Sequence, residues 1–213
     1  MNLALRPSAA GEAGAPTGNP AVAAHAVNAL GLELLANGTA ADAHALLSPY
    51  SIQTALAMTF AGAAGATRAE MAKVLHYPGD EAALHQSFAA LQQALEDVAR
   101  KTAAQAEDAR KWGGPSEPVV LTVANRLFGQ DGYAFRAPFL TLVKNSYQAP
   151  FQPLDFARDP QAATRTINGW VEQERRQPNR ELAPPAARDK HTRHLLFNAL
   201  QPPEPEGAPF TAS

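Results

Sequence analysis

The sequence of 213 residues contains no cysteine. Disulfide bonds, zinc–thiolate sites and a cysteine nucleophile are therefore excluded for these residues. The absence leaves the cellular compartment open, because secreted proteins can also lack disulfide bonds.

Long apolar segments are missing as well. The apolar run within Met1 to Pro7 is too short for the core of a signal peptide. No segment approaches the ~20 apolar residues that a membrane-spanning helix needs. We therefore expect no membrane association, and either a cytosolic chain or one from which a leader has been removed.

A strong charge of either sign is also absent. The 18 Lys and Arg residues nearly balance the 20 Asp and Glu residues, which gives a net charge of -2. Such a balance does not favour nucleic acid or an anionic membrane as a partner. Hydrophobic residues make up 46 % of the chain, so the composition indicates a protein with a packed core.

Apolar residues recur every three to four positions along most of the chain, which predicts helices. The predicted helices span residues 20–36, 49–63, 67–75, 84–111, 139–147 and 160–175. Ser48-Pro49 and Asp159-Pro160 are start signals, since the first residue can cap the helix and proline suits the first turn. Thr67 and Glu70 have the spacing of a capping box, and His76 and His85 are expected at exposed helix ends.

Few segments have the pattern of strands. Residues 119–128 and 195–200 are the better candidates, and residues 45–47 and 151–156 are shorter ones. Pro150 and Pro153 place the strand at 151–156 on a sheet edge, because proline cannot donate a ladder hydrogen bond. The strand at 195–200 has no later segment to pair with on its far side. We therefore expect a shortened fold that folds poorly or self-associates through the edge at residues 192–200.

Three blocks of sequence together resemble the serpins, a family of protease inhibitors. The first runs from Leu46 through Ser48-Pro49 to Met71, the second is Val123 to Phe128, and the third combines Ile167 to Val171 with Leu195 to Leu200. Their order and spacing identify the chain as a member of this family. The resemblance implies an α+β fold, an incomplete serpin fold in which a helical cluster packs on part of a large mixed β-sheet.

The resemblance also divides the chain and assigns structural residues. Residues 1–19 are expected to form a flexible arm, residues 20–200 the N-terminal part of a serpin domain, and residues 201–213 a proline-rich irregular tail. Ser48, Ser51 and Asn198 match the family's shutter region, where polar groups beneath the sheet exchange partners when it opens. Asn168 and Trp170 match the helix that lies across the sheet.

The family implies inhibition without a catalytic residue or cofactor. An exposed loop is attacked by a serine protease, and the cleaved loop inserts as a new strand before the acyl-enzyme is hydrolysed. The implied partner is a serine protease, and the family suggests an extracellular or periplasmic location. No segment here matches the reactive loop, and Gln201 to Glu206 replace the family's usual continuation. His44 stands where the family often has Asn.

Three functions are left open by the sequence. The first is a serpin-type inhibitor in a full-length form, and the second is a truncated, non-inhibitory fragment or binding module. The third, a hydrolase using Ser48 or Ser51, is disfavoured because no G-x-S-x-G elbow surrounds either residue.

A metal site at His191 and His194 is disfavoured because the residues that follow have a strand pattern. Acidic residues alternate with the basic ones near residues 96–111, so we expect no glycosaminoglycan binding.

Overall fold

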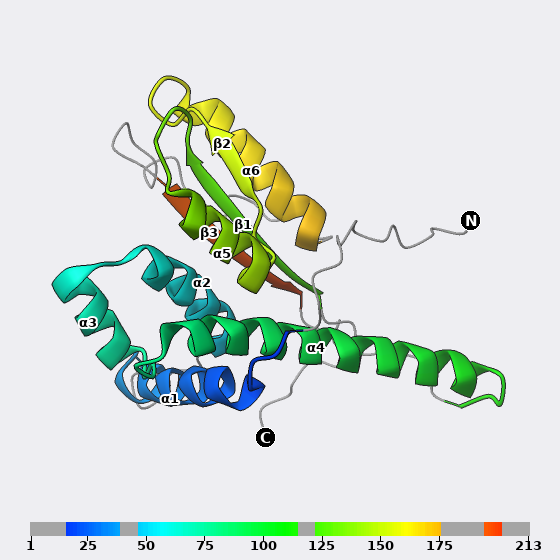
Figure 1. The fold of residues 1–213 in the computed structure, drawn as a ribbon. Coiled ribbons are helices and arrows are strands. Elements are labelled where there is room, and N and C mark those ends of the chain that lie inside the picture. The colour runs from blue at the N-terminus through cyan, green and yellow to red at the C-terminus, as the bar shows by residue number, and fades with distance from the viewer. Residues whose placement is uncertain (1–15, 39–46, 115–121, 176–193, 202–213) are drawn as a thin grey trace.

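A computed structural model describes residues 16–38, 47–114, 122–175 and 194–201. The described helices are Pro20–Gly38 (α1), Pro49–Gly62 (α2), Gly65–Val74 (α3), Glu81–Arg110 (α4), Ala137–Tyr147 (α5) and Pro160–Arg175 (α6). The described strands are Thr122–Gln130 (β1), Phe151–Leu154 (β2) and His194–Gln201 (β3). Helices packed on a small sheet confirm the predicted α+β class (Figure 1).

The three strands form one mixed sheet in the order β2-β1-β3. β1 runs parallel to β2, with Leu127 opposite Phe151, and antiparallel to β3, with Asn125 opposite Asn198. β2 lies at the edge of the described sheet, as Pro153 predicted. β3 forms the other edge of the described strands, as its expected lack of a second partner implied.

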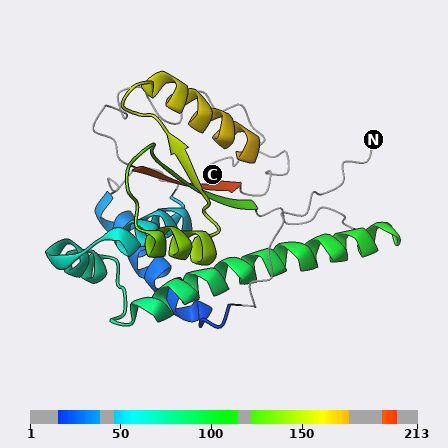
Figure 2. The ribbon, with the colours of Figure 1, turned by 45° about the horizontal axis from the view of Figure 1, so that its top comes forward.

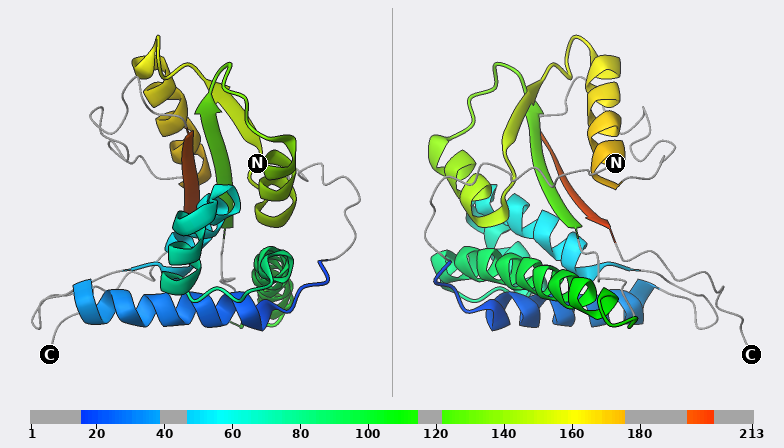
Figure 3. Two further views of the ribbon diagram at one scale, coloured as in Figure 1. Left: turned by 60° about the vertical axis from the view of Figure 1, so that its left-hand side comes forward. Right: turned by 90° about the vertical axis from the view of Figure 1, so that its right-hand side faces the viewer.

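The sheet lies between two helical layers, with α6 on one face and α5 and α2 on the other (Figure 3). Successive side chains of a strand point to opposite faces, so β1 contributes to both layers. Leu127 packs with Val143 of α5, and Phe128 packs with Ile167 of α6. This explains why the sequence of β1 is apolar on both faces.

A further layer, formed by α1 and α4, lies below α2. α1 crosses beneath the first half of α4, whose second half extends beyond the rest of the molecule (Figures 1 and 2). Thirty residues make α4 about 45 Å long. Val98 is 51 % exposed in this helix, and Trp112, just past its end, is 85 % exposed. The hydrophobic periodicity therefore predicted the helix correctly but not the exposure of its outer half.

Helix starts follow the predicted signals in two cases and depart from them in one. The Ser48 Oγ caps α2, and the Asp159 Oδ1 accepts from the Ala162 N–H at 2.8 Å before α6. α3 instead begins at Gly65, two residues before Thr67, and has no side-chain cap. The capping-box prediction was wrong because Thr67 lies inside the first turn. Residues 45 and 46 lie outside the described residues.

His85 is buried, with 2 % of its surface exposed, so the prediction of an exposed helix-end residue was wrong. It lies in the first turns of α4, on the face that packs against α5. Its Nδ1 is 2.5 Å from the Tyr147 hydroxyl, and the ring of Phe60 lies beside it. Its Nε2 is 3.7 Å from Glu81, whose carboxylate is paired with Arg68. Burial lowers the pKa of His85, and burial also raises the pKa of Tyr147.

A buried neutral histidine makes folding stability depend on pH. Below the ordinary pKa of 6.5, His85 binds a proton in the unfolded chain but stays neutral in the folded one. The unfolding free energy therefore falls as the pH drops through this value. We expect His85→Gln to flatten the pH dependence of the unfolding free energy between about pH 6.5 and 5. The unfolding free energy is measured at each pH by urea unfolding followed by circular dichroism. His25→Gln, on exposed surface, is the control. Equal slopes in both variants would contradict a proton-linked role for His85.

Candidate functional site

The N-terminus of α2, which contacts β3, carries two linked hydroxyls. The Ser48 Oγ lies 2.9 Å from the Ser51 Oγ and accepts from the Ser51 N–H at 3.4 Å. The Ile52 N–H donates to the Ser48 carbonyl at 3.1 Å, which closes the first turn. Both serines are partly buried. Their described hydrogen bonds run to each other and to the backbone, which is the arrangement of a helix cap rather than of a serine paired with a catalytic base.

Asn125 is a buried amide on β1, and its neighbours on the same face of the strand, Val123 and Leu127, are apolar. Only 4 % of its surface is exposed, and its Nδ2 donates to the Tyr147 carbonyl at 2.8 Å. Tyr147 is the last residue of α5, so its carbonyl has no partner within the helix. Asn125 therefore ties β1 to the end of α5. Sequence reasoning did not select it as a site residue, although a lone amide inside an apolar strand was a usable signal.

The sheet register brings Asn198 next to this bond. Asn198 of β3 pairs with Asn125 of β1 in the antiparallel ladder. The side chain of Asn198 lies outside the described residues. The structure thus links Ser48 to Ser51 directly, and brings Asn198 beside Asn125 through the backbone. A shutter role for these residues stays a prediction.

A further buried amide lies one turn into α2. Gln53 is fully buried and its Nε2 donates to the Leu75 carbonyl at 2.8 Å. Its Oε1 has no hydrogen-bond partner among the described residues. Buried polar atoms are nearly always paired, so this one is a group available to accept a new bond. The buried side chain of Gln53 therefore has one paired and one unpaired polar atom among the described residues.

The opposite face of the sheet carries the other predicted pair. Trp170 of α6 is 8 % exposed, and its ring lies 5.8 Å from that of Phe128 in an edge-to-face arrangement. The Oδ1 of Asn168 is buried without a hydrogen-bond partner in the described part of the chain. The packing role assigned to these two residues by family resemblance remains a prediction, since only their surroundings are observed.

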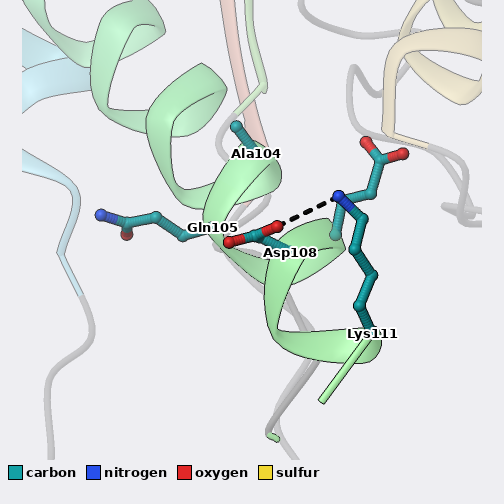
Figure 4. Close-up of a pocket in the computed structure, with 5 residues that line it drawn as sticks. Ala104, Gln105, Asp108 and Lys111 are labelled. Carbon is teal, nitrogen blue, oxygen red and sulfur yellow. Dashed lines mark hydrogen bonds and ion pairs between the residues drawn. The ribbon is translucent and has the colours of Figure 1, made fainter. Parts of the chain in front are cut away.

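The outer end of α4 forms a hollow lined by Ala104, Gln105, Glu107, Asp108 and Lys111 (Figure 4). The Lys111 Nζ lies 3.0 Å from the Asp108 Oδ1, and Arg100 is paired with Asp97 further back on the helix. Neighbouring acidic groups thus balance these cations. The absence of glycosaminoglycan binding stays the prediction for this surface.

Two further findings concern the described residues alone. None of their helices combines the length and apolarity needed to cross a membrane. No three side chains able to ligate a metal come together among them.

Comparison with known proteins gives consistent matches. A family model described as Serpin (serine protease inhibitor) matches residues 25–201. Leukocyte elastase inhibitor of Bos taurus is 37 % identical over 154 residues, which are 72 % of this chain and 36 % of the relative. An uncharacterised serpin-like protein of Thermococcus kodakarensis is 33 % identical over 150 residues, 70 % of this chain and 32 % of the relative. The chain thus spans about a third of the length of these curated relatives.

Solved structures match over most of the chain. A cleaved serpin, Serpin 42Da, aligns with a TM-score of 0.61 and 25 % identity, covering 85 % of this chain and 44 % of the other. Uncleaved ovalbumin aligns with a TM-score of 0.61 and 24 % identity, covering 86 % and 44 %. These alignments confirm the fold, of which the chain covers only a part.

The hydrogen bond from Asn125 to Tyr147 makes a specific energetic prediction. Asn125→Ala leaves a buried carbonyl without a donor, which should lower the unfolding free energy by about 1–3 kcal/mol. Asn37→Ala is the matched control, because the Asn37 amide makes a similar bond to the Glu33 carbonyl on exposed surface. The control should change stability by less than about 0.5 kcal/mol. Similar losses in both variants, measured by chemical unfolding, would show that burial of the bond is irrelevant.

Proposed function

Because the chain belongs to the serpin family, we propose that it forms the N-terminal part of an inhibitor of serine proteases. Inhibition proceeds by insertion of a cleaved loop into the sheet. The family is one of inhibitors rather than of catalytic enzymes, and a relative bears the name leukocyte elastase inhibitor. Residues 20–200 are our proposed extent of the serpin portion, and an extracellular or periplasmic location is a prediction from the family.

The unpaired side of β3 among the described strands is the observation that carries this proposal. An edge strand presents a row of backbone N–H and C=O groups that can pair with an added strand. In the proposed reaction the protease serine attacks a loop outside the described residues and forms an acyl-enzyme. The cleaved loop then pairs along β3 and carries the protease with it. Displacement of the catalytic groups by ~1 Å can slow hydrolysis about a hundredfold, so the ester persists.

The polar groups on the α2 and α5 side of the sheet favour a model in which β3 can move and β1 is held in place. β1 is held to α5 by the buried bond from Asn125 to Tyr147. The Ser48–Ser51 pair lies at the end of α2, the helix that contacts β3. Hydroxyl groups can donate and accept, so they can exchange partners at small cost when a neighbouring strand shifts. We propose this exchange as the shutter role of Ser48, Ser51 and Asn198.

The proposal is tested with the full-length protein that contains this chain. Mixed with a panel of serine proteases that begins with elastase-like enzymes, it should form a complex stable to heating in detergent, because the acyl ester is covalent. Gel electrophoresis detects the complex. A protease whose active-site serine has been chemically blocked is the control and should form none. Cleavage of the protein without any trapped complex, across the panel, would overturn the inhibitor proposal.

A second candidate is a non-inhibitory serpin-like fragment or binding module. It is favoured by the side of β3 that is unpaired among the described strands, because such an edge can also pair with another chain. In such a fragment the β3 edge would be filled by another copy rather than by a loop. Trapping of a protease by the 213 residues alone would exclude this candidate.

Edge pairing of this kind predicts self-association of the 213-residue chain. We expect its sedimentation coefficient to rise with concentration, because backbone groups of β3 lie unpaired at an edge of the described sheet. A synthetic peptide with the sequence of residues 194–201 should dissociate the assemblies by pairing with the same edge. A scrambled peptide of equal composition is the control. A monomer at all concentrations would contradict this prediction.

A further inference from the structure

Arg126 is a cation on a face of the sheet that is otherwise covered by apolar contacts. It lies between Ala124 and Phe128 on β1, and alternate residues of a strand share a face. Ala124 and Phe128 both pack against the cluster formed with α6, which includes Ile167 and Trp170. Arg126 is partly buried, so contacts within the interface offset part of the cost of removing its charge from water.

The guanidinium finds an aromatic ring on one side and an amide on the other. Its Cζ lies 5.5 Å from the centre of the Trp170 ring, which is cation–π distance. Its Nη1 donates to the Gln152 Oε1 of β2 at 3.3 Å. A single side chain on β1 therefore connects β2, β1 and α6.

Apolar packing surrounds this contact in the described part of the interface. The Nε of Arg126 and the Oδ1 of Asn168 are buried without hydrogen-bond partners among the described residues. The cluster that α6 forms with Ala124, Phe128 and Leu195 of the strands is apolar, and apolar contact has no preferred direction. The cation–π contact, in contrast, depends on where the cation lies over the ring.

We propose that Arg126 is a positioning residue that fixes α6 on the sheet and so limits how readily the strands shift beneath that helix. This inference rests on the proposed function, because insertion beside β3 requires the strands to move relative to α6, which contacts β3 as well as β1. Weakening the contact at Arg126 should therefore ease strand insertion. It should also loosen α6 in the protein before any protease is added.

The first test measures the environment of Trp170 in the 213-residue chain. Trp112→Phe provides the background, because exposed Trp112 would otherwise dominate quenching. In this background Arg126→Gln should raise the acrylamide quenching constant of Trp170 by about threefold and shift its emission to the red, since the ring loses its cation. Arg126→Lys keeps a cation and should restore most of the protection. Arg165→Gln removes a charge from exposed surface of the same helix and should change nothing.

The second test measures strand insertion in the full-length protein. Arg126→Gln should speed formation of the trapped complex by about threefold at saturating protease, whereas Arg165→Gln should leave it unchanged. Trp170→Phe weakens the same contact from the other side, so it should act in the same direction, and adding Arg126→Gln to it should have little further effect. This variant also keeps the test possible if Arg126→Gln does not fold.

The outcomes separate the two proposals. If Arg126→Gln exposes Trp170 while the unmodified full-length protein traps no protease, the inhibitor proposal fails, and with it the effect on insertion, but the contact that holds α6 stands. If the unmodified protein traps protease while Arg126→Gln changes neither quenching nor trapping rate, the role of Arg126 is overturned. Independent, additive effects of Arg126→Gln and Trp170→Phe would also overturn it.

Discussion

Tyr147 connects a helix of the lower layer, α4, to the central strand, β1. Its hydroxyl meets His85 of α4, and its carbonyl accepts the hydrogen bond from Asn125 of β1. The ring itself is buried against Phe88. One residue at the end of α5 thus links the helical layer to the central strand, in addition to the direct contacts of α2 with α5 and β3.

The two faces of β1 pack against different helices. On the face toward α5, Asn125 and Leu127 fix the strand within the larger core. On the face toward α6, Arg126 and Phe128 meet a smaller cluster with a single helix above it. A strand anchored on one side and lightly covered on the other is suited to a fold whose sheet has to accept an additional strand.

The hydrophobic periodicity predicted the helices and strands well. It depends on which face of an element is buried, and this pattern can be read from residues close together in the sequence. The helices at 49–62 and 160–175 begin where Ser48-Pro49 and Asp159-Pro160 predicted, since caps and first-turn prolines act locally. His85 was misplaced because its partner Tyr147 is 62 residues away, and no local pattern reports such a pair. The start of α3 was missed because Gly65 has a positive φ, 58°, which local capping rules do not predict.

The candidate site was predictable only in outline. Ser48 and Ser51 could be found from the cap and from the family resemblance, but the role of Asn125 depends on a carbonyl in another helix. The contact of Arg126 with Trp170 joins residues 44 positions apart, and in the sequence Arg126 is simply a charge within a strand.

The outer half of α4 extends past the helices and strands that hold its first half. Its backbone bonds are internal to the helix, and little of the core rests on it. Turns can therefore be added or lost there without changing the register of the sheet. It is also where a reporter group can be attached about as far from the sheet as the described structure allows.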